Sequence, residues 1–187
     1  MMATTLDGAR VAILFCDGVE RSELTEPLDA LRQAGARVDL VSTERGEVQM
    51  FEHLDKAETI MADRAVGEVD ASEYDGLMLP GGVANPDRLR MEPAAVEFVR
   101  AFFDQHKPVA AICHAPWTLV EADVVRGRTV TSWPSLRTDL RHAGASWVDE
   151  EVRVDGELVT SRKPDDLPAF CAQMVDTFSR ALSGSTR

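Results

Sequence analysis

The segment Cys113-His114-Ala115-Pro116 places a nucleophile and a general acid–base group directly after an apolar run at residues 109–112. An apolar strand, a nucleophile in a tight turn, a small residue and a proline together have the shape of a nucleophile elbow, which lifts the side chain above the sheet. There a thiol faces backbone N–H groups and the positive end of the next helix, which favour the thiolate. The same pattern also fits a buried thiol that only packs.

Two further predicted strand ends have acidic or glycine residues. Cys16 ends one apolar run and is followed by Glu20 and Glu23, whereas Gly81 and Gly82 end another. In open α/β sheets ligands bind off the carboxyl ends of the strands, so these segments are candidates for the same site. A carboxyl group beside a thiol can share its proton, and paired glycines let backbone N–H groups approach a substrate oxygen. A solvated acidic loop and a turn that needs positive φ are the alternatives.

His114 can act as a general acid or base, because imidazole titrates near neutral pH. Its backbone N–H, with those of Gly81 and Gly82, could form an oxyanion hole. A core histidine that donates to the backbone is the alternative. These assignments give Cys113, His114 and Glu23 as candidate catalytic residues.

The other cysteines and histidines suggest no second site. Three cysteines are an odd number without a CxxC pair, so they fit neither a disulfide framework nor a zinc site. Cys16 and Cys171 are interpreted as packed thiols. His53, His106 and His142 lack a second ligand at metal spacing and are interpreted as surface or structural residues, so we expect no metal. No P-loop or GxGxxG motif is present, so we expect no nucleotide cofactor.

Composition predicts one acidic globular domain over residues 1–187, with its core at about 10–182. The chain has 20 Lys and Arg against 32 Asp and Glu, a net charge of −12, and 44% hydrophobic residues. This charge disfavours specific nucleic-acid and membrane-surface binding, so a small molecule or another protein is the expected partner. The first ten residues contain no apolar signal segment and no run approaches the ~20 residues of a membrane span, so we expect a cytoplasmic protein.

Alternating strands and helices predict one α/β domain around a mostly parallel sheet. The expected strands are residues 11–15, 37–42, 76–79, 109–112, 129–131, 151–154 and 158–161, with a short excursion hairpin at 48–51 and 59–62. The expected helices are residues 93–106, 116–122, 135–142 and 165–181, after a first helix that ends near residue 35.

Pro27 is expected to lie in the first turn of the first helix, because proline is tolerated there and removes a hydrogen bond deeper inside. Thr25 is then a better N-cap than Ser22. On this interpretation Glu20 and Glu23 belong to the loop that precedes the helix.

Five segments, in this order along the chain, resemble the PfpI-like branch of the DJ-1/PfpI superfamily. They are Glu20-Arg21-Ser22-Glu23 with Pro27; Leu79-Pro80-Gly81-Gly82; Ala111-Ile112-Cys113-His114 with Pro116; Gly127-Arg128 with Thr131-Ser132-Trp133-Pro134; and Ser161-Arg162 with Pro164-Asp165-Asp166-Leu167. The resemblance extends from residue 11 to about 180. It implies a flavodoxin-like three-layer sandwich related to class I glutamine amidotransferases, a homodimer or larger oligomer, and a role in stress.

The resemblance also implies roles for individual residues. Cys113 matches the nucleophile, His114 the histidine that follows it, and Glu23 the glutamate that approaches the sulfur. Asp87 lies where PfpI-like members have a glutamate that reaches the histidine of a neighbouring subunit. The chain departs from the pattern in having the shorter aspartate, one extra residue before it, and Ala115 where many members have glycine.

The activity that this resemblance implies is cofactor-free cysteine chemistry on reactive carbonyls. Members are credited with deglycation of protein and nucleotide adducts of glyoxal and methylglyoxal, with glutathione-independent glyoxalase activity and, in some cases, with peptidase activity. Gly81, Gly82 and Ala115 would then surround the substrate oxygen. The alternatives are a PfpI-type peptidase or amidase, and a redox-sensing or chaperone-like stress protein that uses oxidation of Cys113.

Overall fold

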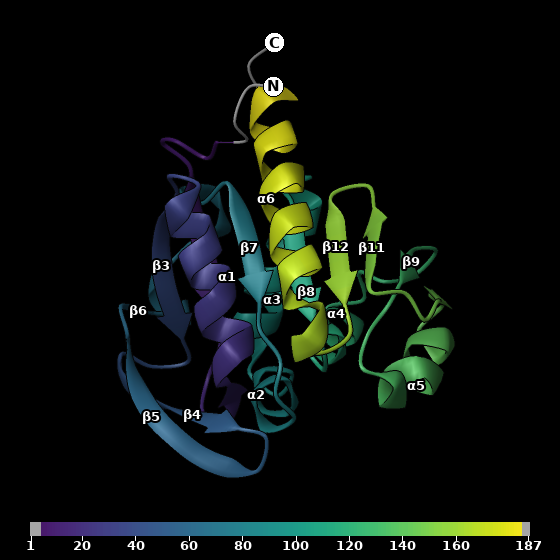
Figure 1. Cartoon of the computed structure of the whole chain (residues 1–187), viewed down its shortest axis with the longest axis horizontal. Helices are drawn as coiled ribbons and strands as arrows, with labels where there is room; N and C mark the ends of the chain where they lie inside the picture. The colour runs from purple at the N-terminus through teal and green to yellow at the C-terminus, as the bar shows by residue number, and fades with distance from the viewer. Residues whose placement is uncertain (1–4, 185–187) are drawn as a thin grey trace.

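The computed structural model describes residues 5–184, in which a seven-stranded sheet lies between two layers of helices (Figure 1). The strands follow the order β11-β12-β8-β7-β1-β3-β6, and all neighbours are parallel except the pair β11–β12. Their bounds are β1 (Arg10–Leu14), β3 (Arg37–Ser42), β6 (Arg64–Ala65), β7 (Gly76–Leu79), β8 (Val109–Ile112), β11 (Val152–Asp155) and β12 (Leu158–Ser161). The predicted α/β class and mostly parallel sheet are confirmed.

The central strands are apolar throughout because helices cover both faces of the sheet. Val11 and Ile13 pack in one core cluster with α1 (Arg21–Gln33) and α6 (Leu167–Gly184), which lie in front of the sheet in Figure 1. The alternate residues of β1 pack on the opposite face. The helices α3 (Pro93–Asp104) and α4 (Pro116–Glu121) contribute to that second cluster. No helix within residues 5–184 is long and apolar enough to cross a membrane.

The start of α1 differs from the prediction. The helix begins at Arg21 with Glu20 as its N-cap, so Pro27 lies inside it and Glu23 lies in its first turn. Thr25 is not a cap, and its hydroxyl donates to the carbonyl of Arg21 at 3.0 Å. The helix starts early because the preceding strand is fixed by pairing with a strand from a distant segment. Glu23 is thereby attached to a rigid element.

A three-stranded excursion lies at the carboxyl edge of the main sheet (Figure 1). It consists of β2 (Val19–Glu20), β4 (Gly46–Glu52) and β5 (Asp55–Ala62), in the order β2-β4-β5. The predicted hairpin therefore exists and is longer than expected. Its turn places His53 at φ 58°, a left-handed conformation uncommon outside glycine.

One short helix at the same edge was missing from the prediction. The helix α2 (Ala84–Leu89) contains the buried Asn85, whose side-chain oxygen accepts from the N–H of Cys16 at 2.8 Å. Its amide donates to the carbonyls of Pro80 and Gly81 at 2.9 and 3.0 Å. Asn85 thus ties together the carboxyl ends of β1 and β7.

Short elements complete the outer end of the sheet, beyond β11 and β12. They are β9 (Thr129–Val130), α5 (Arg137–His142), β10 (Ser146–Trp147) and the 3-10 turn Pro134–Leu136. Two further 3-10 turns, Val66–Glu68 and Ala71–Glu73, lie between β6 and β7, and another, Pro164–Asp166, leads into α6. The segment after β9 returns to the turn after β8, where the N–H of Trp133 donates to the carbonyl of Cys113.

Candidate active site

Cys113 follows β8 in the elbow conformation that the sequence predicts. Its φ is 64°, its N–H donates to the carbonyl of Ser161 at 3.1 Å, and its carbonyl accepts from the N–H of Trp133 at 2.9 Å. Ala115 has an ordinary helical φ of −53°, so the positive φ belongs to the cysteine and alanine causes no strain. The N–H of Ala115 donates to the carbonyl of Ile112 at 3.1 Å. Ala115 therefore has no free N–H for the oxyanion role suggested for it.

Glu23 lies beneath the cysteine and is fully buried. Among residues 5–184, neither carboxyl oxygen has a hydrogen-bond partner at an acceptable distance and angle. Burial and then the charge of Glu20 raise its pKa to about 8, whereas the nearby Cys113 thiol and the N–H groups of Gly82 and Gly81 oppose this rise. Glu23 is thus an acid that holds its proton at neutral pH.

Gly81 is required because the carboxyl group and the elbow approach its backbone from both sides. A Cβ at this position would collide with Glu23 Oε2 and would lie 2.6 Å from the Cβ of Cys113. Gly82 has a φ of 83°, and a Cβ there would collide with the carbonyl oxygen of Gly18. Gly81 therefore allows close packing around the thiol and Glu23, and Gly82 adopts the positive φ that the sequence offers as one alternative.

The expectation that the elbow alone favours a thiolate needs correction. Burial, and then the charge of Glu23, raise the pKa of the Cys113 thiol, while the N–H groups of Gly82 and His114 lower it. The following helix has only six residues, so its dipole is small. The thiol and the carboxyl group oppose each other's charge and lose their first proton as a coupled pair. The carboxyl group can accept the thiol proton only in the molecules in which it is already ionised, and its ionised fraction grows as the pH approaches 8.

The ring of His114 faces the sulfur, which sequence adjacency alone did not establish. Its Nδ1 lies 3.2 Å from Cys113 Sγ, and its Nε2 lies 3.5 Å from Ser135 Oγ. The ring stacks on Trp133, with the centroids 5.9 Å apart and the planes at 23°. Burial lowers the pKa of His114 to about 4. The imidazole is therefore neutral at physiological pH and can exchange one proton with the thiol.

A pocket of about 250 Å³ opens above this group. It is lined by Glu20, Glu23, His53, Leu54, Gly82, Val83, Cys113, His114, Trp133 and Pro164. Sequence reasoning missed the hairpin-turn residues His53 and Leu54 and the loop residue Val83, because no motif marks them. Only the positions of the hairpin and of α2 bring them to the cysteine.

Asp87 does not reach this pocket within the chain. It lies on α2 and lines a separate, open hollow with residues of α3, including Val96 and Arg100. The contact with the histidine of a neighbouring subunit therefore stays a prediction. Within the described part of the chain, no group of three or more His, Cys, Asp and Glu side chains could hold a metal ion.

The sheet order and the cysteine elbow at its carboxyl edge define a flavodoxin-like α/β sandwich with a thiol-based site. A family model described as the DJ-1/PfpI family matches residues 9–177, and the chain belongs to this family.

Proteins with related sequences include named deglycases. The chain is 44% identical over 162 residues to protein/nucleic acid deglycase 2 of Escherichia coli, covering 86% of this chain and 92% of the relative. It is 42% identical over 166 residues to deglycase TK1284 of Thermococcus kodakarensis, covering 89% and 97%. General stress protein 18 of Bacillus subtilis is 40% identical over 164 residues, covering 87% and 94%.

Solved structures with the same fold include a two-domain protein from Anabaena variabilis with DJ-1/ThiJ/PfpI-like and ferritin-like domains. It matches with a TM-score of 0.85 at 36% identity, over 89% of this chain and 47% of that chain. DJ-1beta of Drosophila melanogaster matches with a TM-score of 0.82 at 26% identity, over 95% and 97%.

Proposed function

We propose that the chain is a cysteine enzyme that consumes reactive dicarbonyls and hydrolyses their early adducts with amino and thiol groups. The observation that carries the proposal is the contact between Cys113 Sγ and His114 Nδ1 at 3.2 Å, above the buried acid Glu23. Relatives named deglycases, at 42% and 44% identity, support the same reaction class.

The first step forms a bond between sulfur and the carbonyl carbon. With methylglyoxal, the Cys113 sulfur adds to the aldehyde carbon, the π pair moves to oxygen, and the thiol proton passes to that oxygen through Glu23 or His114. With an aminocarbinol adduct, the same carbon exchanges its C–N bond for the C–S bond, and the amine leaves with the proton. Both routes give the same hemithioacetal.

The second step is an internal redox exchange that needs no external oxidant. A base removes the hydrogen of the carbon bound to sulfur as a proton and returns it to the neighbouring carbonyl carbon, while the hydroxyl proton of the first carbon passes to the oxygen of the second. The first carbon is thereby oxidised to the thioester carbonyl and the second is reduced to an alcohol. The neutral imidazole of His114 lies at the sulfur and can hold this proton, and Glu23 can do so once it is ionised. The product is a lactoyl thioester, and water then cleaves the C–S bond to give lactate and the free thiol.

The backbone supplies positive dipoles where negative charge develops on oxygen. The N–H groups of Gly82 and His114 lie close enough to the sulfur to lower the pKa of Cys113. The same two groups are our candidates for the oxyanion hole. Neutral imidazole can donate or accept without first losing a charge.

The size of the pocket favours adducts over peptides. Its volume of about 250 Å³ is slightly below the ~300–1,000 Å³ range of ligand pockets. A small carbonyl compound or the end of one modified side chain is a suitable substrate, so we rank peptidase activity lower. We further propose glycated proteins or nucleotides as substrates, self-association as at least a homodimer, and a cytoplasmic location.

The test is to follow methylglyoxal loss and lactate formation together with the purified protein. We expect stoichiometric conversion by the native chain and none by Cys113→Ala. Native rates in that variant, or methylglyoxal loss without lactate, would show that the proposal is wrong. Peroxide treatment that adds two oxygens to Cys113, with no dicarbonyl turnover, would instead favour the redox-sensing alternative.

A further inference from the structure

The Cys113 pocket is acidic as well as apolar, and the proposed mechanism leaves one of its carboxyl groups unused. Glu20 and Glu23 both line the pocket, and none of its ten lining residues in the described chain is lysine or arginine. His114, with a pKa of about 4, adds no positive charge. Because Glu23 holds its proton, a ligand in this pocket meets the negative charge of Glu20 with no lysine or arginine beside it.

Glu20 is held in place without a cationic partner. It follows β2 as the N-cap of α1, is only 7% exposed, and accepts a hydrogen bond from the N–H of His53 at 3.0 Å. No ion pair joins it to any residue between 5 and 184. A carboxylate buried without a cation is costly, so a ligand that supplies a cation gains affinity from it.

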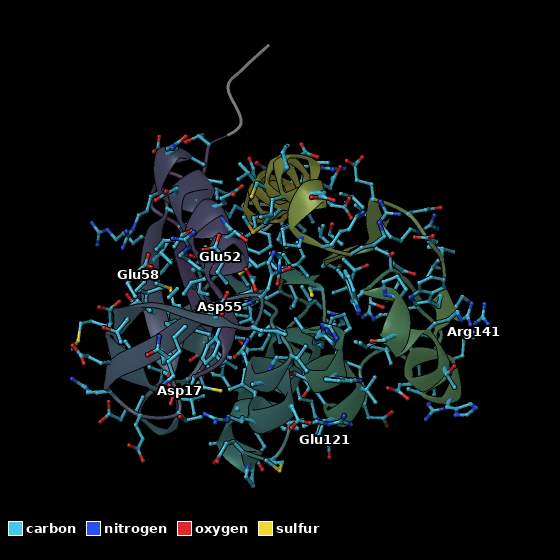
Figure 2. All side chains as sticks on the ribbon, turned by 60° about the horizontal axis from the view of Figure 1, so that its bottom comes forward. Asp17, Glu52, Asp55, Glu58, Glu121 and Arg141 are labelled. Carbon is cyan, nitrogen blue, oxygen red and sulfur yellow. The ribbon has the colours of Figure 1, made fainter. Side chains whose placement is uncertain are left out.

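The beginning and end of the β4–β5 turn add more acidic groups near the pocket. Figure 2 shows Glu52, Asp55 and Glu58 gathered on this hairpin. Arg21 of α1 is already paired with Glu52 at 2.9 Å and Glu58 at 3.6 Å, and the hairpin itself contributes Lys56 as its one lysine or arginine. The three carboxylates Glu52, Asp55 and Glu58 outnumber the cations Arg21 and Lys56, so the surface beside the pocket has a negative charge.

We infer that Glu20 makes the pocket selective for cationic adducts, specifically the guanidinium-bearing adducts of arginine side chains, over nucleotide adducts that contain phosphate. The inference rests on the proposed function of the same site. A guanidinium group donates to a carboxylate through paired N–H groups, whereas a phosphate would bring a second anion to Glu20. The exposed apolar side chains of Leu54, Val83 and Trp133 can cover the methylene stem of an arginine.

A binding experiment tests the selectivity without requiring catalysis. Nα-acetylarginine amide and its neutral isostere Nα-acetylcitrulline amide are titrated against Cys113→Ser, with affinities measured by NMR. We expect arginine amide to bind about tenfold tighter, as for one charge-assisted contact. The double variant Cys113→Ser/Glu20→Gln should bind both equally. The glutamine oxygen can still accept from the His53 N–H, which preserves the turn.

A kinetic experiment then compares methylglyoxal adducts of different charge. The substrates are the Nα-acetylarginine amide adduct, the neutral N-acetylcysteine amide adduct and the guanosine monophosphate adduct. We expect Glu20→Gln to lower the ratio of kcat/KM for the arginine adduct over the neutral adduct about tenfold, and to raise the ratio for the nucleotide adduct. The control is Glu121→Gln, which removes one charge from an exposed residue of α4 and should leave all ratios unchanged.

The outcomes separate the two proposals. No turnover of any adduct, with selective binding of arginine amide retained, would contradict the proposed function and keep the inferred cation site. Turnover of all three adducts with ratios that Glu20→Gln does not change, and equal binding of the arginine and citrulline amides, would overturn the inference alone. Equal effects of Glu20→Gln and Glu121→Gln would also overturn it, because the cause would then be net charge.

Discussion

Two cysteines lie near the carboxyl edge of the same sheet, each in the wall of a pocket of similar size. Cys113 follows β8 and Cys16 follows β1, and their pockets have volumes of about 250 and 260 Å³. Both thiols are at least nine-tenths buried. Position in the fold and burial therefore do not distinguish a catalytic thiol from a structural one.

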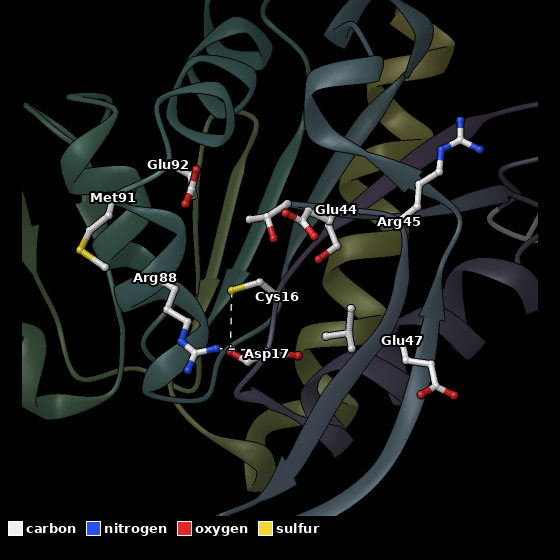
Figure 3. A pocket seen from close by; sticks show the side chains of 11 residues that line it. Cys16, Asp17, Glu44, Arg45, Glu47, Arg88, Met91 and Glu92 are labelled. Atoms are coloured by element: carbon white, nitrogen blue, oxygen red, sulfur yellow. Dashed lines mark hydrogen bonds and ion pairs between the residues drawn. The ribbon is translucent and has the colours of Figure 1, made fainter.

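The difference lies in what each sulfur contacts. Cys113 Sγ meets an imidazole nitrogen and a buried carboxyl group, both of which can take its proton. Cys16 Sγ contacts the carbonyl oxygen of Asn85 at 3.4 Å, and a carbonyl cannot accept a proton for transfer. In Figure 3 two of the charged side chains of that pocket, Asp17 and Arg88, pair with each other at 3.5 Å. Burial then raises the pKa of Cys16 to about 12.

Removing each thiol in turn is expected to give the largest contrast. Cys113→Ala should reduce dicarbonyl turnover by at least about 10³-fold, because the C–S bond can no longer form. Cys16→Ala should keep turnover within about twofold. Lactate formation measures both variants, and thermal unfolding checks that each is folded. Comparable losses of turnover in the two variants would contradict the view that Cys113 is catalytic and Cys16 is structural.

Replacing Glu23 is expected to have the next largest effect. Glu23→Gln keeps the shape of the protonated acid but can neither give up a proton nor take one back, so turnover should fall about 10²–10⁴-fold. The backbone conformation at Cys113 should be retained in this variant, because glutamine fills the same space as the protonated acid. A Glu23→Gln enzyme with native turnover would leave His114 as the sole proton acceptor.

The same variant should change the pH dependence of stability. Because burial raises the pKa of Glu23 from 4.5 to about 8, the folded state binds one more proton than the unfolded state between these values. Stability from this group is complete below pH 4.5 and is lost as the pH rises through about 8, by at most about 5 kcal/mol. Glu23→Gln should flatten this decline in denaturant titrations. Cys16→Ala should not, since the pKa of its thiol is about 12.

His114 should have a smaller effect on rate. Replacement by asparagine should lower kcat about 10²-fold, because one of two proton carriers is lost. With a pKa near 4, the native imidazole stays neutral above about pH 5, so its ring resonances should not shift between pH 5.5 and 8. A titration of this ring near pH 6.5 in NMR spectra would contradict the neutral-imidazole assignment.

Sequence reasoning predicted the arrangement of the candidate site well wherever a motif coincided with a strand end. The elbow, the two glycines and the parallel sheet follow from apolar runs that end in turn residues, and the segments after Cys16, Leu79 and Ile112 do converge at one edge. The start of α1 was wrong because Pro27 was given more weight than tertiary pairing. The strand pairing of Glu20 with Phe51, which joins segments far apart in the sequence, fixes that start and cannot be deduced from local propensity.

The protonation states of Cys113 and Glu23 could not be predicted from the sequence either. Helix-end reasoning predicted a thiolate at Cys113, whereas burial by distant segments dominates the pKa values of both the thiol and Glu23. The pocket rim also depends on tertiary structure, because His53 and Leu54 come from a hairpin turn with no motif. Local sequence therefore predicted which thiol, imidazole and carboxyl groups come together, and long-range packing determines their protonation.

Alkylation by iodoacetamide gives the finest comparison of the two thiols. The reactive form is the deprotonated one, so reactivity rises with pH. At Cys113 the coupled pair loses its first proton near the pKa of about 8 that burial gives Glu23, so the rate should rise through pH 8 and then level off. At Cys16, with a pKa of about 12, the rate should still rise tenfold per pH unit.

Mass spectrometry of each labelled cysteine should show Cys113 reacting at least about tenfold faster at pH 8. Equal rates at that pH would mean that the neighbouring carboxyl and imidazole groups do not activate the sulfur in the free protein, and that activation depends on bound substrate.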